Sequence, residues 1–157
     1  MTEDRLTHWR TMFSAPRRMC VLIVEDDPAD AERLAGLMRE VRSAVIVAES
    51  AERAMQFVGG HFDLALVNLS LPGMSGIEFI MQFRKIHPGV PVAIVTGYDP
   101  GCLSQLGVAH VFAKPFLAEH RDIMLAEFNL IASDYEADTE GHCRITEGSV
   151  GRNHVAA

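Results

Sequence analysis

The stretch LALVNLSLPGMSG, residues 64–76, joins a short apolar run to a tight turn and then to a helix start. Its first four residues are all apolar, as expected for a strand buried on both faces of a parallel sheet. The run ends at Asn68, and Pro72 and Gly73 follow as a pair that favours a turn. Residues 76–86, GIEFIMQFRKI, then repeat apolar residues at helical spacing. This stretch therefore predicts a buried strand with a polar end and a following helix, the unit of an α/β sheet.

The same alternation of strand and helix extends in both directions from this stretch. Apolar runs predict four further strands, at residues 19–25, 44–49, 90–96 and 110–113. Helical periodicity predicts three further helices, at residues 28–41, 50–58 and 118–131, and residues 102–107 leave room for at most a short helix. Strands and helices that alternate in this way form βαβ units with a parallel sheet covered on both faces. The predicted fold class is α/β, with a doubly wound five-stranded parallel sheet.

The folded domain is expected to occupy residues 19–131. Residues 1–18 form an N-terminal extension in which Leu6, Trp9 and Phe13 have the spacing of a short helix. Residues 132–157 are polar, with glycines and scattered acids, and are expected to form a disordered tail without an output domain.

Composition excludes several classes of protein. The chain has 157 residues, of which 48% are hydrophobic and 22% charged, as in globular domains that bury a core. Its net charge of −7 argues against a nucleic-acid-binding surface. No apolar run reaches the length of a membrane span, and the first residues lack the apolar core of a signal peptide. The three cysteines are well separated and form no disulfide framework, so a cytoplasmic protein is expected.

Polar residues gather at the predicted carboxyl ends of the strands, where α/β sheets carry their sites. Glu25 and Asp26 are adjacent acids after a buried strand, so they repel each other and need a counter-charge or a cation. Lys114 ends the last strand, and lysine is rarely buried unless it is paired. Thr96 is an ordinary strand-end residue when taken alone, and Asp27, before a proline, is most simply a helix N-cap.

Four motifs in this order, VLIVEDDPAD, LALVNLSLPGMSG, AIVTG and VFAKPF, closely resemble the receiver domain of two-component response regulators. The resemblance covers roughly residues 20–131 and implies the flavodoxin-like strand order, with a cis bond between Lys114 and Pro115. In that family, an aspartate at the end of the third strand takes a phosphoryl group from a phosphohistidine of a partner kinase. The resemblance therefore implies a signalling module and not an enzyme, with a sensor histidine kinase or another signalling protein as partner. It implies no nucleic-acid or membrane partner, and it leaves a homodimer open.

The resemblance also assigns roles to the strand-end residues. The positions that would hold Mg²⁺ through oxygen ligands are Glu25, Asp26, Asn68 and the backbone carbonyl of Ser70. Thr96 and Lys114 would bind phosphoryl oxygens, as in other phosphoryl-transfer sites.

Three features depart from the family pattern. Asn68 stands at the phosphoacceptor position, and a neutral amide is a poor nucleophile that gives no stable acyl phosphate. With one negative charge fewer, the site is expected to bind Mg²⁺ weakly or not at all. Val111 stands at the switch position, three residues before Lys114, where the family usually has a tyrosine or phenylalanine. The connection between Thr96 and Lys114 is also about one helical turn shorter than is usual in the family.

Three functions remain to be compared. The leading hypothesis is a single-domain receiver that acts as a protein-interaction module and cannot form an aspartyl phosphate at residue 68. The alternative is a phosphoaccepting regulator whose native aspartate has been replaced by an engineered Asn68. The third is an enzyme or cofactor binder on the same fold, against which the strand-end loops lack a glycine-rich phosphate cradle.

Overall fold

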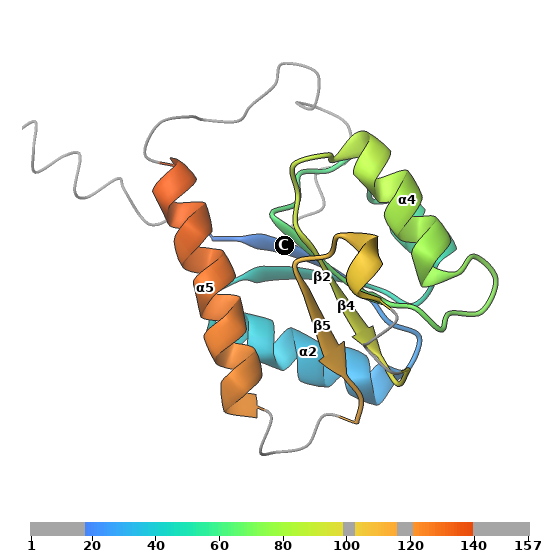
Figure 1. Ribbon diagram of the computed structural model, residues 1–157, viewed down its shortest axis with the longest axis horizontal. Helices are drawn as coiled ribbons and strands as arrows, with labels where there is room; N and C mark the ends of the chain where they lie inside the picture. Colours follow the sequence, from blue (N-terminus) through green and yellow to red (C-terminus); the bar gives the residue numbers. More distant parts are fainter. Residues whose placement is uncertain (1–17, 99–102, 116–120, 140–157) are drawn as a thin grey trace, which may run out of the picture.

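The computed structural model describes residues 18–98, 103–115 and 121–139, and its elements are labelled as in Figure 1. The expected extension before residue 18 and most of the expected tail lie outside the described residues. The strands are β1 (Cys20–Val24), β2 (Ala44–Ala48), β3 (Leu64–Asn68), β4 (Val92–Thr96) and β5 (His110–Ala113). The helices are α2 (Pro28–Glu40), α3 (Ala51–Met55), α4 (Gly76–Ile86), the 3₁₀ helix η2 (Ser104–Leu106) and α5 (Arg121–Thr139).

The five strands form one parallel sheet in the order β2-β1-β3-β4-β5. This order and the alternating helices confirm the predicted doubly wound α/β fold. Strands β1 and β3 are neighbours in the middle of the sheet, so the residues that follow Val24 and Val67, which are paired in register, lie side by side. The carboxyl ends of all five strands lie at one edge, which we call the carboxyl edge.

Helices cover both faces of the sheet, and each face has its own core. In Figure 1, α4 and α5 lie on opposite sides of the strands. The core on the side of α3 and α4 includes the buried rings of Phe62, Phe79 and Phe83. The core on the side of α2 and α5 includes Met38 and Phe128, both fully buried. Strands β1, β3 and β4 are almost entirely buried, which explains why they are continuous apolar runs.

The sequence predicts helix N-caps at Asp27 and Ser50, and the structure confirms both. Asp27 is the N-cap of α2, where its carboxylate accepts hydrogen bonds from the amides of Ala29 and Asp30. Ser50 caps α3, and Ser75 forms a capping box with Glu78 at the start of α4.

Helix α4 has the predicted bounds, but α3 and α5 differ from the predicted helices at their C-terminal ends. Helix α3 ends at Met55 because the chain then continues through i→i+3 hydrogen bonds to Phe57 instead of further helical turns. Helix α5 continues to Thr139, past the predicted end at residue 131. The helical spacing of Phe79, Ile80, Phe83 and Ile86 predicts that all four face the core, but Ile86, the last residue of α4, is 49% exposed.

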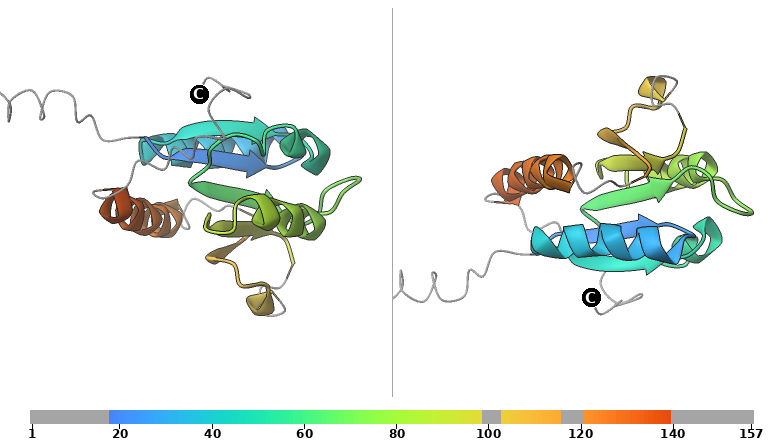
Figure 2. Two further views of the ribbon diagram at one scale, coloured as in Figure 1. Left: turned by 90° about the horizontal axis from the view of Figure 1, so that it is seen from above. Right: turned by 90° about the horizontal axis from the view of Figure 1, so that it is seen from below.

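The connection between β4 and β5 is short, as predicted. Within its described residues, the helical content is the single turn η2, which Figure 2 shows at the margin of the molecule beyond β5. Arg84 of α4 donates hydrogen bonds to the carbonyls of Leu106 and Gly107 at 2.6 and 2.7 Å. Gly107 has φ +60°, a left-handed conformation that glycine adopts without strain. Arg84 therefore attaches this turn to the neighbouring helix.

Candidate functional site

Four strands bring their polar ends together at the carboxyl edge. Glu25 follows β1, Asn68 ends β3, Thr96 ends β4 and Lys114 follows β5. Glu25, Asn68 and Thr96 are almost completely buried, with 2%, 5% and 0% exposure. Buried polar side chains are costly unless they are hydrogen-bonded, so their partners define the site. Residues Glu25, Asp26, Asn68, Ser70, Thr96 and Lys114 are called the strand-end site below.

The amide group of Asn68 is the centre of this site. Its Nδ2 donates to Glu25 Oε1 and to Asp26 Oδ1, both at 3.0 Å, and lies 3.4 Å from the carbonyl oxygen of Ser70. Its Oδ1 accepts a hydrogen bond from the Ser70 amide at 3.1 Å. The structure thus brings together all four positions that the sequence assigned to a metal. It gathers them around an N–H donor.

The orientation of the Asn68 amide is fixed by its surroundings. In the reverse orientation, Oδ1 would face two carboxylates and a carbonyl, and Nδ2 would face the amide N–H of Ser70. Each of these contacts would then pair donor with donor or acceptor with acceptor. All four contacts therefore agree on one assignment of the side-chain oxygen and nitrogen.

Lys114 is paired with two carboxylates. Its Nζ lies 2.7 Å from Glu25 Oε2 and 3.0 Å from Asp30 Oδ2. Burial alone would lower the pKa of Lys114, but the hydrogen bonds and ion pairs with Glu25 and Asp30 outweigh it and raise the pKa. Both oxygens of Glu25 have partners: Oε2 contacts Lys114, and Oε1 accepts a hydrogen bond from the Asp27 amide at 3.1 Å. The lysine therefore remains protonated and ties β5 to β1 and α2.

Asp30 was not identified from the sequence as a site residue. It lies in the first turn of α2, beyond the capping residue Asp27, where an acidic residue is ordinary at a helix start. Nothing in the local sequence distinguishes its contact with Lys114 from that general preference. The contact depends on how α2 packs beside the end of β5.

The loop after Asn68 is held by two further contacts. The carboxylate of Glu52, at the start of α3, accepts a hydrogen bond from the Met74 amide at 2.6 Å. This hydrogen bond lowers the pKa of Glu52. Gly76 begins α4 so close to β3 that a Cβ atom there would lie 2.1 Å from the carbonyl oxygen of Asn68. Gly76, the second glycine of the LPGMSG motif, is thus required by its close approach to the backbone of Asn68.

Thr96 and Val111 occupy the remaining assigned positions. The Thr96 hydroxyl accepts a hydrogen bond from the Tyr98 amide at 3.1 Å, and its carbonyl accepts from the Lys114 amide at 2.8 Å. The bond from the Lys114 amide joins the ends of β4 and β5, and the bond from the Tyr98 amide holds the turn after β4. Val111 is partly buried and packs against the core on the side of α3 and α4. The phosphoryl-binding role of Thr96 and the switch role of Val111 remain predictions.

As folded, the strand-end site does not fit a divalent cation. A cation needs oxygen ligands directed at it, whereas the oxygens of Glu25, Asp26 and Ser70 are directed at the Asn68 nitrogen. Among residues 18–98, 103–115 and 121–139, no cluster of three or more His, Cys, Asp or Glu side chains is arranged to hold a metal.

The fold and the strand-end residues define an α/β signalling domain of the receiver type. Residues 21–125, more than half of the chain, match the family described as the response regulator receiver domain. The chain belongs to this family, which serves two-component signal transduction.

Comparison with characterised proteins agrees with this family. A cyclic di-GMP phosphodiesterase of Thermotoga maritima is 41% identical over 81 residues, which are 52% of this chain and 22% of that protein. The sensory transduction protein RegX3 of Mycolicibacterium smegmatis is 36% identical over 103 residues, 62% of this chain and 45% of that protein. The chain thus spans less than half of the length of either relative.

Solved structures show the same fold. A CheY-like receiver domain protein from Methanospirillum hungatei JF-1 superposes with a TM-score of 0.65 and 25% identity, covering 78% of this chain and 98% of that one. The response regulator TrrA of Thermotoga maritima, solved in complex with Mg(2+)-BeF, gives a TM-score of 0.60 and 26% identity. That comparison covers 69% of this chain and 98% of TrrA.

In the part of this chain that the structure describes, no helix is long and apolar enough to cross a membrane.

Proposed function

We propose that this receiver domain acts in two-component signalling as a protein-interaction module that forms no aspartyl phosphate at residue 68. The observation that carries the proposal is the side chain at the phosphoacceptor position, an amide whose nitrogen donates to the acids beside it. Its partner would be a sensor histidine kinase or another signalling protein.

The chemistry of the amide supports the absence of phosphorylation. An acyl phosphate forms when an anionic carboxylate oxygen attacks phosphorus, and an amide oxygen is neutral and weakly nucleophilic. Asn68 Oδ1 is also already engaged, since it accepts the Ser70 amide. Lys114, which would pair with a phosphoryl oxygen, is held by Glu25 and Asp30.

The site's charge supports weak binding of Mg²⁺. Aspartate at residue 68 would add a third acid to Glu25 and Asp26, whereas Asn68 adds none. Hard divalent cations bind more tightly as the number of charged oxygen ligands increases. Weak Mg²⁺ binding would in turn leave an approaching phosphoryl group unshielded from the two acids.

The test is attempted labelling with acetyl phosphate and MgCl₂, read out by intact mass. Wild-type protein is expected to gain no phosphoryl group. Asn68→Asp provides the comparison, and labelling of that variant alone would show that Asn68 is what silences the site. A hydroxylamine-sensitive phosphoryl group at residue 68 of the wild-type chain would contradict the proposal.

A second candidate is a phosphoaccepting regulator in which Asn68 replaces a native aspartate. It is favoured by the four other strand-end residues that such a regulator would use, namely Glu25, Asp26, Thr96 and Lys114. The natural coding sequence decides between the two, because this candidate requires an aspartate codon at position 68.

A further inference from the structure

The strand-end site contains two acids that need a positive partner. Glu25 Oε1 and Asp26 Oδ1 each lie 3.0 Å from the same nitrogen of Asn68, so the two oxygens are within about 6 Å of each other. Carboxylates this close repel unless a cation or N–H groups lie between them. Lys114 supplies one positive charge, but it contacts Glu25 Oε2 and Asp30, on the other side of Glu25. The group between Glu25 and Asp26 is the Asn68 amide.

The Asn68 amide has one N–H proton for each of the two carboxylates beside it. Its NH₂ group carries two protons, and two of its three acceptors, the carboxylates, lie at 3.0 Å. The third acceptor, the Ser70 carbonyl, lies farther away at 3.4 Å. Both protons are thus directed at the negatively charged oxygens, and hydrogen bonds to charged acceptors are the stronger kind.

The same contacts keep a cation out. An ion that bound the oxygens of Glu25, Asp26 and Ser70 would have to occupy the position of the Asn68 nitrogen. Turning the amide over would present its oxygen to the ion, but it would also place the NH₂ group against the Ser70 amide N–H. Entry of a cation therefore costs the hydrogen bond to Ser70 as well as those to the two acids.

We propose that the Asn68 amide is a built-in substitute for the divalent cation, so the strand-end site keeps one conformation whether or not Mg²⁺ is present. The inference deepens the proposed function and rests on it for the role of the domain. It goes further because it assigns the exclusion of metal to the amide group itself. A lower number of acidic ligands weakens the attraction for Mg²⁺, and the amide nitrogen excludes the ion by occupying its position.

Thermal unfolding with EDTA or with millimolar MgCl₂ tests this in the full chain. The Tm of the wild type is expected to agree within about 1 °C in the two conditions. Asn68→Asp is expected to unfold about 5 °C lower in EDTA, because it adds a negative charge among acceptors, and to recover with MgCl₂. Asn129→Asp, the same change at an exposed position of α5, should respond to neither condition.

Asn68→Ala distinguishes the effect of the amide group on metal binding from the effect of the number of acids. It has the same number of acids as the wild type but no donor between Glu25 and Asp26. The inference expects its Tm to be lower than that of the wild type in EDTA and to rise by several degrees with MgCl₂. If Asn68→Ala shows no response to MgCl₂, the number of acids explains the loss of metal, and the inference is wrong.

A second measurement uses only the wild-type chain and serves if a variant fails to fold. The side-chain NH₂ signals of Asn68 in ¹⁵N NMR are expected to stay unchanged during titration with MgCl₂. A saturable shift of these signals would overturn the inference. Neither measurement involves acetyl phosphate, so this inference and the proposed function can fail separately.

Discussion

At the scale of single residues, the glycine at the start of α4 and the asparagine at the end of β3 depend on each other. A Cβ atom on Gly76 would lie 2.1 Å from the Asn68 carbonyl oxygen and 2.7 Å from Leu69 Cα. Both neighbours are backbone atoms, which cannot move aside as a flexible side chain can. The backbone at the end of β3 therefore leaves no room for a Cβ atom at position 76.

Gly76→Ala is expected to destabilise the protein by about 3 kcal/mol, because the helix start must move away from β3. The free energy of unfolding from urea titration measures this. Gly36→Ala is the matched control, since Gly36 lies within α2 and a Cβ there meets no atom within 4 Å. The control should stabilise the protein by about 0.5–1 kcal/mol through helix propensity. Equal effects of the two changes would contradict the close contact.

Most residues of the strand-end site could be predicted from sequence because each is fixed by its strand. A residue at the carboxyl end of a buried strand must lie at the carboxyl edge, whatever the details of packing. Asp30 and Glu52 escaped prediction because they lie on helices. Their contacts depend on how each helix is rotated and placed against the sheet, which local sequence does not determine. The orientation of the Asn68 amide could not be predicted either, because it depends on the positions of the four groups that contact it.

At the scale of elements, the short connection between β4 and β5 depends on α4. Its length was predictable from the number of residues between the two strands. The two hydrogen bonds from Arg84 to Leu106 and Gly107 were not, because they join segments more than 20 residues apart. They satisfy carbonyls that η2, a single turn, cannot satisfy itself.

Arg84→Met is expected to lower the free energy of unfolding by about 1–3 kcal/mol, since it removes both hydrogen bonds and keeps an apolar stem. Amide hydrogen exchange should also become faster in residues 103–109. Lys85→Met, a change at the exposed neighbouring position of the same helix, should alter the free energy by less than about 0.5 kcal/mol. If exchange in this segment is unchanged in Arg84→Met, Arg84 does not hold the turn.

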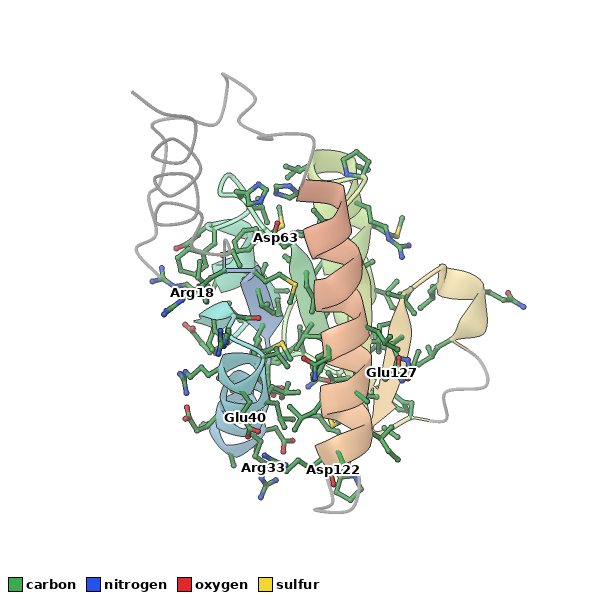
Figure 3. All side chains as sticks on the ribbon, turned by 90° about the vertical axis from the view of Figure 1, so that its left-hand side faces the viewer. Arg18, Arg33, Glu40, Asp63, Asp122 and Glu127 are labelled. Atoms are coloured by element: carbon green, nitrogen blue, oxygen red, sulfur yellow. The ribbon has the colours of Figure 1, made fainter. Side chains whose placement is uncertain are left out.

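At the scale of the whole molecule, charged contacts join elements that are distant in sequence. Lys114 ties the end of β5 to Glu25 after β1 and to Asp30 of α2. A second ion pair joins Glu40, at the end of α2, to Arg121, at the start of α5. Figure 3 shows α2 and α5 side by side, with Asp63 at the end of the sheet opposite to Arg33 and Asp122. Helices α2 and α5 are therefore connected both by their shared core and by charge.

Lys114 makes stability depend on pH in the alkaline range. Its pKa in the folded protein is raised above the ordinary 10.5, so folding favours the charged form. Its stabilising contribution is therefore complete below pH 10.5 and is lost as the pH rises through the folded pKa. The difference in free energy of unfolding between wild type and Lys114→Met should be constant near neutral pH and should shrink above 10.5. Lys85→Met, at an exposed position, is the control for the loss of a lysine charge.

The hydrogen-bond directions around Asn68 also determine what a carboxylate would need at the same position. Three acceptors face the nitrogen of this side chain and one donor faces its oxygen, so the two ends of the amide are both satisfied. An aspartate has the same shape but would meet those three acceptors with a negatively charged oxygen. Asn68 therefore satisfies the site without a bound ion, whereas an aspartate there would be stabilised by a cation.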